Sequence, residues 1–253
     1  MYLPVIPQQS CAQAWVAAAS AIAPSRAAYN VIIDVDQPIT HDARDNQIIA
    51  YLDSFLRDHD QNPIATVANT IFPQSLYKQH DAPALYKAYL EGYDRLARKG
   101  WGRYFERLIR HKKLDGHEYN PLEVLIERLR GRKDAAAQRF TSAYELAVYD
   151  PLRDGRTFRG GQCLSFLSFK LHPERGLTLT AMYRNHAYVT RCLGNLIGLG
   201  RLQAFIADQS GLTQGPLTCI STHAELDVCD KWTIREAREL IANVSVLARD
   251  PST

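Results

Sequence analysis

The sequence has 253 residues, of which 46% are hydrophobic and 23% are charged, as expected for a globular protein with one large core. The formal net charge is only +3, and acidic and basic residues are interleaved along the chain. A protein that binds duplex nucleic acid usually gathers its Lys and Arg residues on one face, so the composition argues against nucleic acid and leaves small anionic molecules as ligands.

Five cysteines are scattered along the chain: Cys11, Cys163, Cys192, Cys219 and Cys229. Their number is odd and no CxxC pair occurs, so we predict neither a disulfide framework nor a metal site. The apolar stretch 14–23 lacks the preceding basic residues of a secretory signal, and no apolar run reaches membrane-spanning length. We therefore expect a cytoplasmic protein without a membrane partner.

Periodic patterns predict a mixture of helices and strands in the first half of the chain. Ser10 is a typical cap for the Ala-rich helix after it, and Asn120 followed by Pro121 is a typical helix start. Residues 65–72 are apolar and end at a proline, which fits either a buried strand or a short helix. The remaining elements expected here are a strand at 29–35 and helices at 45–56, 82–98, 104–109 and 121–130.

The densest basic run comprises Arg107, Arg110, His111, Lys112 and Lys113. A solvated helix end, stabilised by the helix dipole, is the simpler interpretation of such a run. A patch that binds phosphate or nucleic acid is the alternative.

The stretch from Gly160 to Leu226 alternates like a sheet and then becomes helical. Two β-rich runs flank a turn, which predicts an antiparallel hairpin, and Gly211 is placed to end the helix that follows. A last strand would carry His223 towards the same end of the sheet. We expect strands at 163–171, 177–183 and 216–222 and a helix at 193–209.

Chemically informative residues occur in a characteristic order here: Tyr149-Asp150-Pro151, Cys163 at a strand start, Tyr183-Arg184 after the hairpin, Asn195 eleven residues after the arginine, and Thr222-His223 after the last strand. This order resembles the C-terminal half of thymidylate synthase and of the related pyrimidine nucleotide hydroxymethylases. The resemblance covers residues 149–223, and Gly102-Arg103-Tyr104 looks like the family's Tyr-Gly segment further upstream.

The resemblance implies one α+β domain over residues 1–253, with a large mixed β-sheet flanked by helices. It implies that two copies pack sheet to sheet as a homodimer with shared active sites. It also implies a pyrimidine nucleotide monophosphate as substrate and 5,10-methylenetetrahydrofolate as one-carbon donor. The irregular order of helices and strands excludes, by itself, only a repeated βαβ architecture.

Cys163 is the candidate nucleophile. C6 of a pyrimidine ring is electron-poor, and a thiolate that adds there makes C5 nucleophilic towards a one-carbon electrophile. The resemblance assigns Arg184 to the substrate phosphate, and a guanidinium near the thiol would also lower the thiol's pKa. A buried apolar role for Cys163 and a surface role for Arg184 are the plain alternatives.

Further substrate contacts are implied by the resemblance. Asn195 carries a carbonyl and an amino group that match the N3–H and O4 edge of uracil, whereas relatives that act on cytosine are expected to carry Asp there. Helix capping is the alternative role for Asn195. His223 is assigned to a sugar hydroxyl, with Glu225 nearby in place of the family's tyrosine. Three more residues are assigned to the site: Tyr104 near the ring, Asn185 beside Arg184, and Arg139 reaching the partner subunit's phosphate.

Several positions depart from the family pattern. Gln162 and Leu164 flank Cys163 in place of Pro and His, and Tyr183 and Asn185 flank the phosphate arginine in place of Gln and Ser. Ala187 stands where the family has the aspartate that binds the pterin of folate, and a methyl group cannot accept those hydrogen bonds.

Two further parts of the family's folate chemistry are missing from the sequence. The glutamate that manages protons at the pyrimidine carbonyl has no clear counterpart, and Asp45 and Asp53 are the candidates for its role. The C-terminal strand and tail that close over folate are not recognisable in residues 244–253. The pyrimidine half of the site is therefore better matched than the cofactor half.

The leading hypothesis is transfer of a methyl group to C5 of a dUMP-like nucleotide through a Cys163–C6 adduct. A pyrimidine nucleotide 5-hydroxymethylase is the first alternative, because a loosely held folate lets water trap the exocyclic methylene. A nucleotide-binding protein that has lost the transfer reaction is the second. A hydrolase that pairs Cys163 with His186 or His223 is the third.

Overall fold

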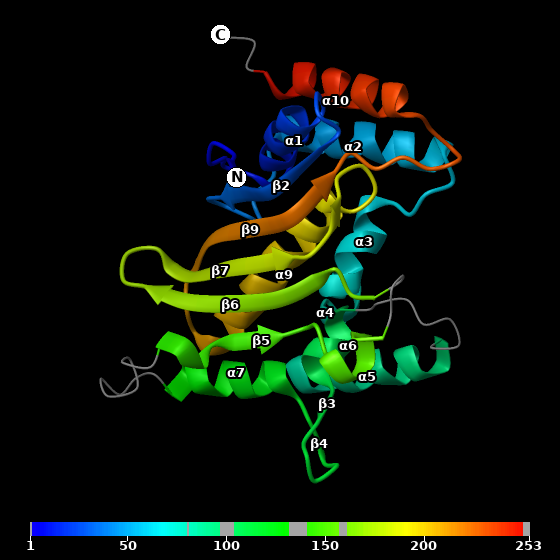
Figure 1. Ribbon diagram of the computed structural model, residues 1–253. Coiled ribbons are helices and arrows are strands. Elements are labelled where there is room, and N and C mark those ends of the chain that lie inside the picture. The colour runs from blue at the N-terminus through cyan, green and yellow to red at the C-terminus, as the bar shows by residue number, and fades with distance from the viewer. Residues whose placement is uncertain (1, 80, 97–103, 132–140, 157–160, 250–253) are drawn as a thin grey trace.

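The computed structural model describes residues 2–79, 81–96, 104–131, 141–156 and 161–249. Over these residues the protein is an α+β structure in which helices flank a large mixed sheet (Figure 1). Buried apolar side chains from both ends of the chain join in one hydrophobic cluster. The fold class predicted from the sequence is confirmed at this level.

Seven described strands form the main sheet: β1 (Leu3–Pro4), β2 (Ala27–Val35), β5 (Glu145–Ala147), β6 (Leu164–His172), β7 (Gly176–Tyr183), β8 (His186–Ala187) and β9 (Gln214–Glu225). Their order is β1-β2-β9-β7-β6-β5, and β8 pairs with β9 outside this path. β9 runs antiparallel to β2 and parallel to β7, whereas β6 runs antiparallel to β7 and β5. A separate hairpin pairs β3 (His111–Lys112) with β4 (Glu118–Tyr119).

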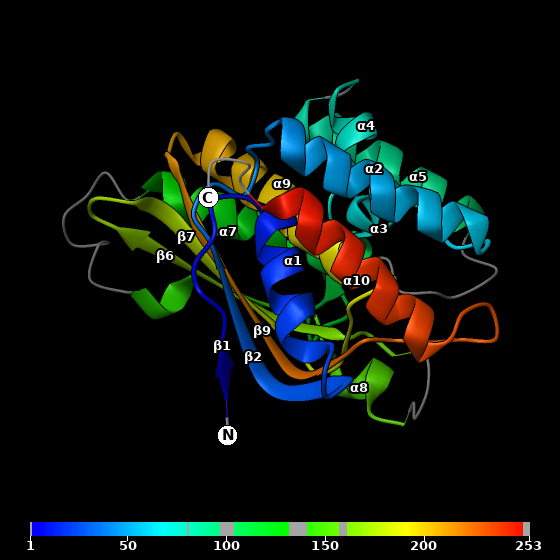
Figure 2. The ribbon, with the colours of Figure 1, turned by 90° about the horizontal axis from the view of Figure 1, so that it is seen from above.

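Ten α-helices lie in the described ranges: α1 (Cys11–Ile22), α2 (Ala43–Asp58), α3 (Ile64–Ile71), α4 (Gln74–Tyr77), α5 (Ala82–Leu96), α6 (Tyr104–Ile109), α7 (Pro121–Arg130), α8 (Pro151–Asp154), α9 (Cys192–Ser210) and α10 (Ile234–Ala248). Figure 2 shows α1, α2, α9 and α10 on the same side of the sheet. None of the helices in these ranges is both long and apolar enough to cross a bilayer.

The two faces of the sheet differ in burial. On the inner face, Leu217, Cys219 and Ser221 of β9 are fully buried beneath the helices. On the outer face, Met182 of β7 and Phe166 of β6 keep 38% and 36% of their surface exposed. This alternation is what a sheet with one helix-covered face requires.

α9 is buried along most of its length because small residues let its neighbours approach closely. A Cβ on Gly194 would lie 2.6 Å from Val67 of α3, and a Cβ on Gly198 would lie 2.7 Å from the Ala68 carbonyl oxygen. α9 also connects the parallel strands β7 and β9, which need such a crossover. Its first turn is therefore held at the end of the sheet where β7 stops.

Most of the predicted elements are confirmed. Ser10 and Asn120 cap α1 and α7, and Gly211 ends α9 in the left-handed conformation with φ of 65°. The ambiguous apolar stretch is the helix α3, which packs against α9 instead of joining the sheet. α10 was not predicted, although Thr233 and Glu236 form a capping box at its start.

The interpretation of the basic run as a solvated helix end is wrong for Arg107. This residue is only 6% exposed, and its guanidinium forms two hydrogen bonds of 2.8 Å with the carboxylate of Asp154. Arg110 also pairs with Asp94 and Glu106, whereas Lys112 and Lys113 are exposed. The run is thus divided between an internal ion pair and a solvated tip.

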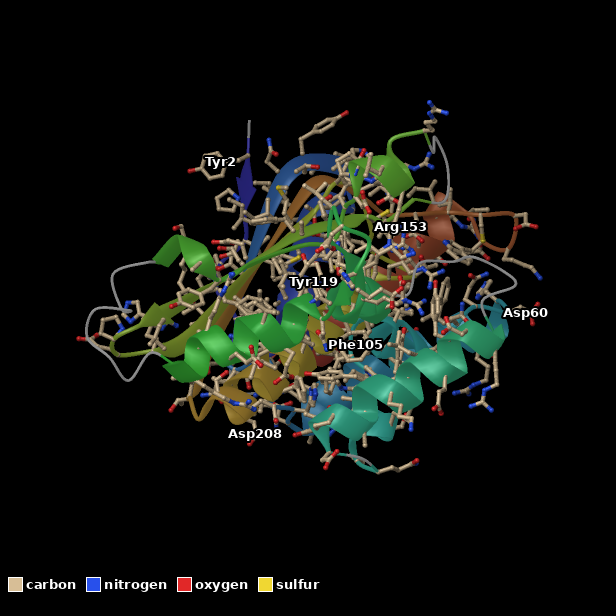
Figure 3. The ribbon with its side chains drawn as sticks, turned by 90° about the horizontal axis from the view of Figure 1, so that it is seen from below. Tyr2, Asp60, Phe105, Tyr119, Arg153 and Asp208 are labelled. Carbon is tan, nitrogen blue, oxygen red and sulfur yellow. The ribbon has the colours of Figure 1, made fainter. Side chains whose placement is uncertain are left out.

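The Arg107–Asp154 pair joins α6 to the segment that precedes the candidate nucleophile. Asp154 also accepts a hydrogen bond from the backbone N–H of Asp150 at 3.0 Å. Close by, Arg153 of α8 lies 3.3 Å from the buried Glu106 of α6, and Phe105 is fully buried (Figure 3). These contacts hold Tyr104, the first residue of α6, against the sheet.

We predict that Asp154→Ala lowers the free energy of unfolding by about 3–5 kcal/mol, because it leaves the Arg107 charge buried without its carboxylate. Urea denaturation followed by circular dichroism measures this change. Arg235→Ala is the matched control, because Arg235 forms an exposed pair with Glu239. The control should change stability by roughly 0.5 kcal/mol or less, and equally small losses in both variants would refute the assignment.

Candidate active site

A cavity of about 410 Å³ lies between α3, α6, the start of β6 and the segment that leads from β7 into α9. Four residues assigned to the site from the sequence line it together: Tyr104, Cys163, Asn185 and Asn195. The other lining residues are Asn62, Thr66, Val67, Thr70, His186, Ala187, Thr190 and Arg191. A thiol, a phenol and two carboxamides from distant parts of the chain thus face one volume.

Cys163 lies directly before β6, where the end of the hairpin holds it beside Arg184. The backbone N–H of Arg184 donates to the Cys163 carbonyl oxygen at 2.9 Å. Burial raises the pKa of the Cys163 thiol, Arg184 and Arg191 oppose that rise, and Glu225 adds to it. The thiol is therefore mostly protonated at neutral pH in the free protein.

Tyr104, the first residue of α6, lines the cavity beside the Cys163 segment. The backbone N–H of Leu164 donates to the Tyr104 hydroxyl at 3.5 Å. Burial raises the pKa of Tyr104 to about 12, so its hydroxyl stays protonated at neutral pH. It can donate a hydrogen bond to a ligand or water near the sulfur.

Arg184 is adjacent to the cavity but does not line it. Its Nε donates to the Gln162 carbonyl oxygen at 2.8 Å, and its guanidinium lies 5.6 Å from the ring centre of Tyr149. The side chain is exposed. These contacts orient the guanidinium beside the Cys163 segment, where it is accessible to an anion outside the cavity.

Asn195 is buried in the first turn of α9, and its side chain is held by a histidine. The Asn195 amide nitrogen lies 3.0 Å from Nε2 of His186, and Nδ1 of His186 lies 2.9 Å from the Ser221 hydroxyl. Burial lowers the pKa of His186 to about 3, so the ring is neutral at physiological pH. Asn195 is not the helix cap, because the N-cap position of α9 is occupied by Arg191, whose side chain forms no capping hydrogen bond.

Asn185 lines the cavity, and its side chain is hydrogen-bonded to His223 and Glu225, which do not line the cavity. The Asn185 amide oxygen lies 2.5 Å from Nδ1 of His223, and its amide nitrogen donates to Glu225 at 3.5 Å. The His223 ring also packs on Tyr29, with the ring centres 5.3 Å apart. The sequence assigned His223 and Glu225 to the sugar of the substrate. In the structure both contact Asn185, and neither lines the cavity.

The hydrolase hypothesis requires a histidine bonded to Cys163. Among the described residues, the polar contacts of His186 go to Asn195 and Ser221, and that of His223 goes to Asn185. The Cys163 sulfur instead lies 4.0 Å from the Gly161 carbonyl oxygen. The geometry offers no Cys-His pair in this part of the chain.

Arg191 is a site residue that the sequence did not indicate. It lines the cavity, and its positive charge acts on both Cys163 and Tyr104. Its position four residues before Asn195 is the signal that could have revealed it, because residues at this spacing share one helix face. The segment before it is fixed by Asp227, which accepts bonds of 2.7 Å from the Val189 N–H and the Thr190 hydroxyl.

The two candidate acids have structural roles. Asp45 is 1% exposed, belongs to the capping box of α2 and accepts a 2.6 Å hydrogen bond from Ser10. Asp53 accepts a 2.8 Å bond from the backbone N–H of Ile64 at the start of α3. Among the described residues that line the cavity, none is Asp or Glu. Ala187, which stands where the family has its pterin-binding aspartate, is one of the lining residues. The described donor set therefore does not match a pterin that needs a carboxylate.

Arg139 lies outside the residues that the structure describes. No described group of His, Cys, Asp and Glu side chains has the arrangement of a metal site. No protein-family model matches the sequence, and no curated protein is significantly similar to it.

We predict that Arg191→Gln slows the alkylation of Cys163 by iodoacetamide at pH 8 by roughly 3- to 10-fold, because loss of the cation raises the thiol pKa and lowers the thiolate fraction. Glu225→Gln should speed the same reaction, because a nearby negative charge is removed. Mass spectrometry of the Cys163 peptide measures the rate, and the exposed Cys229 is an internal control in each sample. A change of the same sign in both variants would contradict these electrostatic roles.

Proposed function

We propose that the protein is a thymidylate synthase-like transferase that adds a one-carbon unit to C5 of a uridine-type nucleotide monophosphate. The observation that carries this proposal is the shared cavity of Cys163 and Asn195. A soft nucleophile and a carboxamide that reads a base edge are the two groups that C5 chemistry on uracil needs. Arg184 lies next to them with an exposed guanidinium.

The chemistry of the first step follows from these groups. The Cys163 thiolate forms a bond to C6 of the ring, and the electron pair of the C5–C6 double bond moves towards C5 and O4. The resulting enolate attacks a one-carbon electrophile through C5, and C5 then loses its proton. Loss of that proton would expel the leaving group of the donor from the one-carbon unit. Hydride from a reduced donor would then complete a methyl group, or water a hydroxymethyl group, and departure of the Cys163 thiolate would restore the C5–C6 double bond. Tyr104, Asn195 and Arg191 supply hydrogen bonds and positive charge around this ring.

5,10-Methylenetetrahydrofolate is the proposed one-carbon donor, with methyl transfer as the leading outcome and hydroxymethyl transfer as the alternative. The Ala187 side chain offers no acceptor to a pterin, and the polar groups on the described wall of the cavity are hydroxyls, amides, one thiol, one imidazole and one guanidinium, with no carboxylate. Methyl transfer requires that the donor stay bound with water excluded, whereas weak retention of the donor would let water complete the reaction and give the alternative, hydroxymethyl product.

The proposal includes a homodimer that packs sheet to sheet. The exposed fractions of Phe166 and Met182 support it, since both side chains lie on the sheet face away from α9. Ile220, on the neighbouring strand, pairs with Met182 and shares that face. Arg139 is proposed to reach the partner's phosphate, as the family resemblance implies.

We predict that Cys163→Ser abolishes tritium release from C5-labelled uridine or deoxyuridine monophosphate in the presence of methylenetetrahydrofolate, because the hydroxyl is a far weaker nucleophile. Tritium release to water measures the step directly. Cys229→Ser is the control, because Cys229 is exposed and does not line the cavity. Undiminished release in Cys163→Ser would remove the nucleophile assignment.

A nucleotide-binding protein without transferase activity is the second candidate. The absence of a carboxylate from the described cavity wall favours it, because proton transfer at the ring then lacks an acid or base of suitable pKa. Calorimetric titration with nucleotide and folate separates the two cases. Folate binding that depends on nucleotide supports the enzyme, and nucleotide binding without any effect of folate supports the binder.

We predict that Arg184→Gln raises the Kd for uridine monophosphate by roughly 10- to 100-fold and leaves the Kd for uridine unchanged, because a charge-assisted bond to phosphate is worth about 1.5–3 kcal/mol. Isothermal titration calorimetry measures both values. Arg235→Gln is the control, because Arg235 pairs with Glu239 on the surface and does not line the cavity. An equal loss for nucleoside and nucleotide would show that Arg184 acts on the structure and not on phosphate.

A further inference from the structure

Four side chains form a continuous hydrogen-bonded network that begins at the wall of the cavity. Asn195 contacts Nε2 of His186 at 3.0 Å, and Nδ1 of His186 contacts the Ser221 hydroxyl at 2.9 Å. The Ser221 hydroxyl lies 3.3 Å from the Tyr188 hydroxyl. All four residues are at most 3% exposed, and Asn195 and His186 are the two that line the cavity.

The His186 ring is neutral, and its position is fixed by neighbouring aromatic rings. It stacks on the Tyr183 ring with a centre-to-centre distance of 4.1 Å and an interplanar angle of 6°. The Tyr188 ring meets the His186 ring edge-on at 5.4 Å, and the Trp15 indole donates to the Tyr188 carbonyl oxygen at 2.7 Å. A neutral imidazole has one donor and one acceptor, so the only freedom left to this ring is which nitrogen carries the proton.

The direction of these hydrogen bonds follows from the Asn195 end of the network. The Asn195 amino group donates to Nε2, which must then be the acceptor, and Nδ1–H donates to Ser221. The Ser221 hydroxyl in turn donates to the Tyr188 hydroxyl. The reverse direction would make Nε2 the donor and would turn the Asn195 oxygen towards His186.

We propose that the proton position on His186, set by Ser221 and Tyr188, fixes the carboxamide of Asn195 in the orientation that reads uracil and rejects cytosine. This inference rests on the proposed function, because it presumes a pyrimidine in the cavity. With its amino group bonded to His186, Asn195 presents an oxygen for N3–H and an N–H for O4. Rotation of the carboxamide exchanges these two groups and matches N3 and the amino group of cytosine instead.

His186, Ser221 and Tyr188 are thus positioning residues for base selectivity. Ser221 and Tyr188 do not line the cavity, and His186, which does, acts here through Asn195. The constraint is cooperative, because the carboxamide cannot rotate unless the imidazole proton and both hydroxyl protons move with it.

Tyr188→Phe is the primary test. Without the acceptor at Tyr188, the Ser221 hydroxyl turns to donate to Nδ1, and the proton of His186 moves to Nε2. We expect the ratio of the Kd for cytidine monophosphate to the Kd for uridine monophosphate to fall at least 10-fold by calorimetry, since one reversed hydrogen-bond pair is worth about that much. Ser221→Ala should lower the same ratio. Tyr86→Phe is the matched control, because Tyr86 bonds Glu123 away from the cavity and should leave the ratio unchanged.

A spectroscopic signature separates positioning from general damage. Long-range ¹H–¹⁵N spectra of histidine-labelled protein should show His186 as the Nδ1–H tautomer throughout pH 5–8 in the wild type, and as the Nε2–H tautomer in Tyr188→Phe. A wild-type Nε2–H tautomer, or a changed tautomer with an unchanged nucleotide ratio, overturns the inference and leaves the proposed function standing. Failure of the wild type to bind any pyrimidine nucleotide removes the proposed function, and this inference with it.

Discussion

The site depends on one crossover, in which α9 connects the parallel strands β7 and β9. Parallel pairing forces the chain to leave the end of β7 and cross the sheet before it can start β9. The end of β7 carries Arg184, and the start of α9 carries Asn195. β6 pairs antiparallel with β7, so Cys163 at the beginning of β6 is brought to the same end. Glycines 194 and 198 allow this arrangement because they let α3 pack directly on α9.

The electrostatic balance of the cavity favours an anionic or polarisable ring over a cation. Arg191 is the charged side chain on the described wall, and Arg184 adds a second guanidinium nearby. Burial nevertheless keeps the Cys163 thiol protonated at neutral pH in the absence of ligand. A protonated thiol of this kind reacts slowly with alkylating and oxidising agents.

Local signals allowed much of the fold to be predicted. The hairpin, α9 with Gly211, and the caps at Ser10 and Asn120 each depend on residues close in sequence. The ambiguity of residues 65–72 could not be removed in this way, because only packing against Gly194 and Gly198 distinguishes the helix from a strand. The buried partner of Arg107 is 47 residues away, which no periodic pattern can reveal.

The candidate site likewise has parts that the sequence predicts and parts that depend on long-range packing. The order of Cys163, Arg184 and Asn195 along the chain predicted that they would come close together, and the structure brings Cys163 and Asn195 to one cavity with Arg184 beside it. The hydrogen bonds of His223 and Glu225 to Asn185 could not be predicted, since they depend on the register of β9 beside β8. The chain from Asn195 through His186 to Ser221 is likewise a product of tertiary packing.

The central claim concerns where a nucleotide lies, and a crystal structure of the protein soaked with uridine monophosphate tests it most directly. The account predicts the uracil ring inside the cavity, with C6 facing the Cys163 sulfur, the N3 and O4 edge on Asn195, and the phosphate on Arg184. A nucleotide bound elsewhere, or a base whose C6 faces away from Cys163, would contradict it.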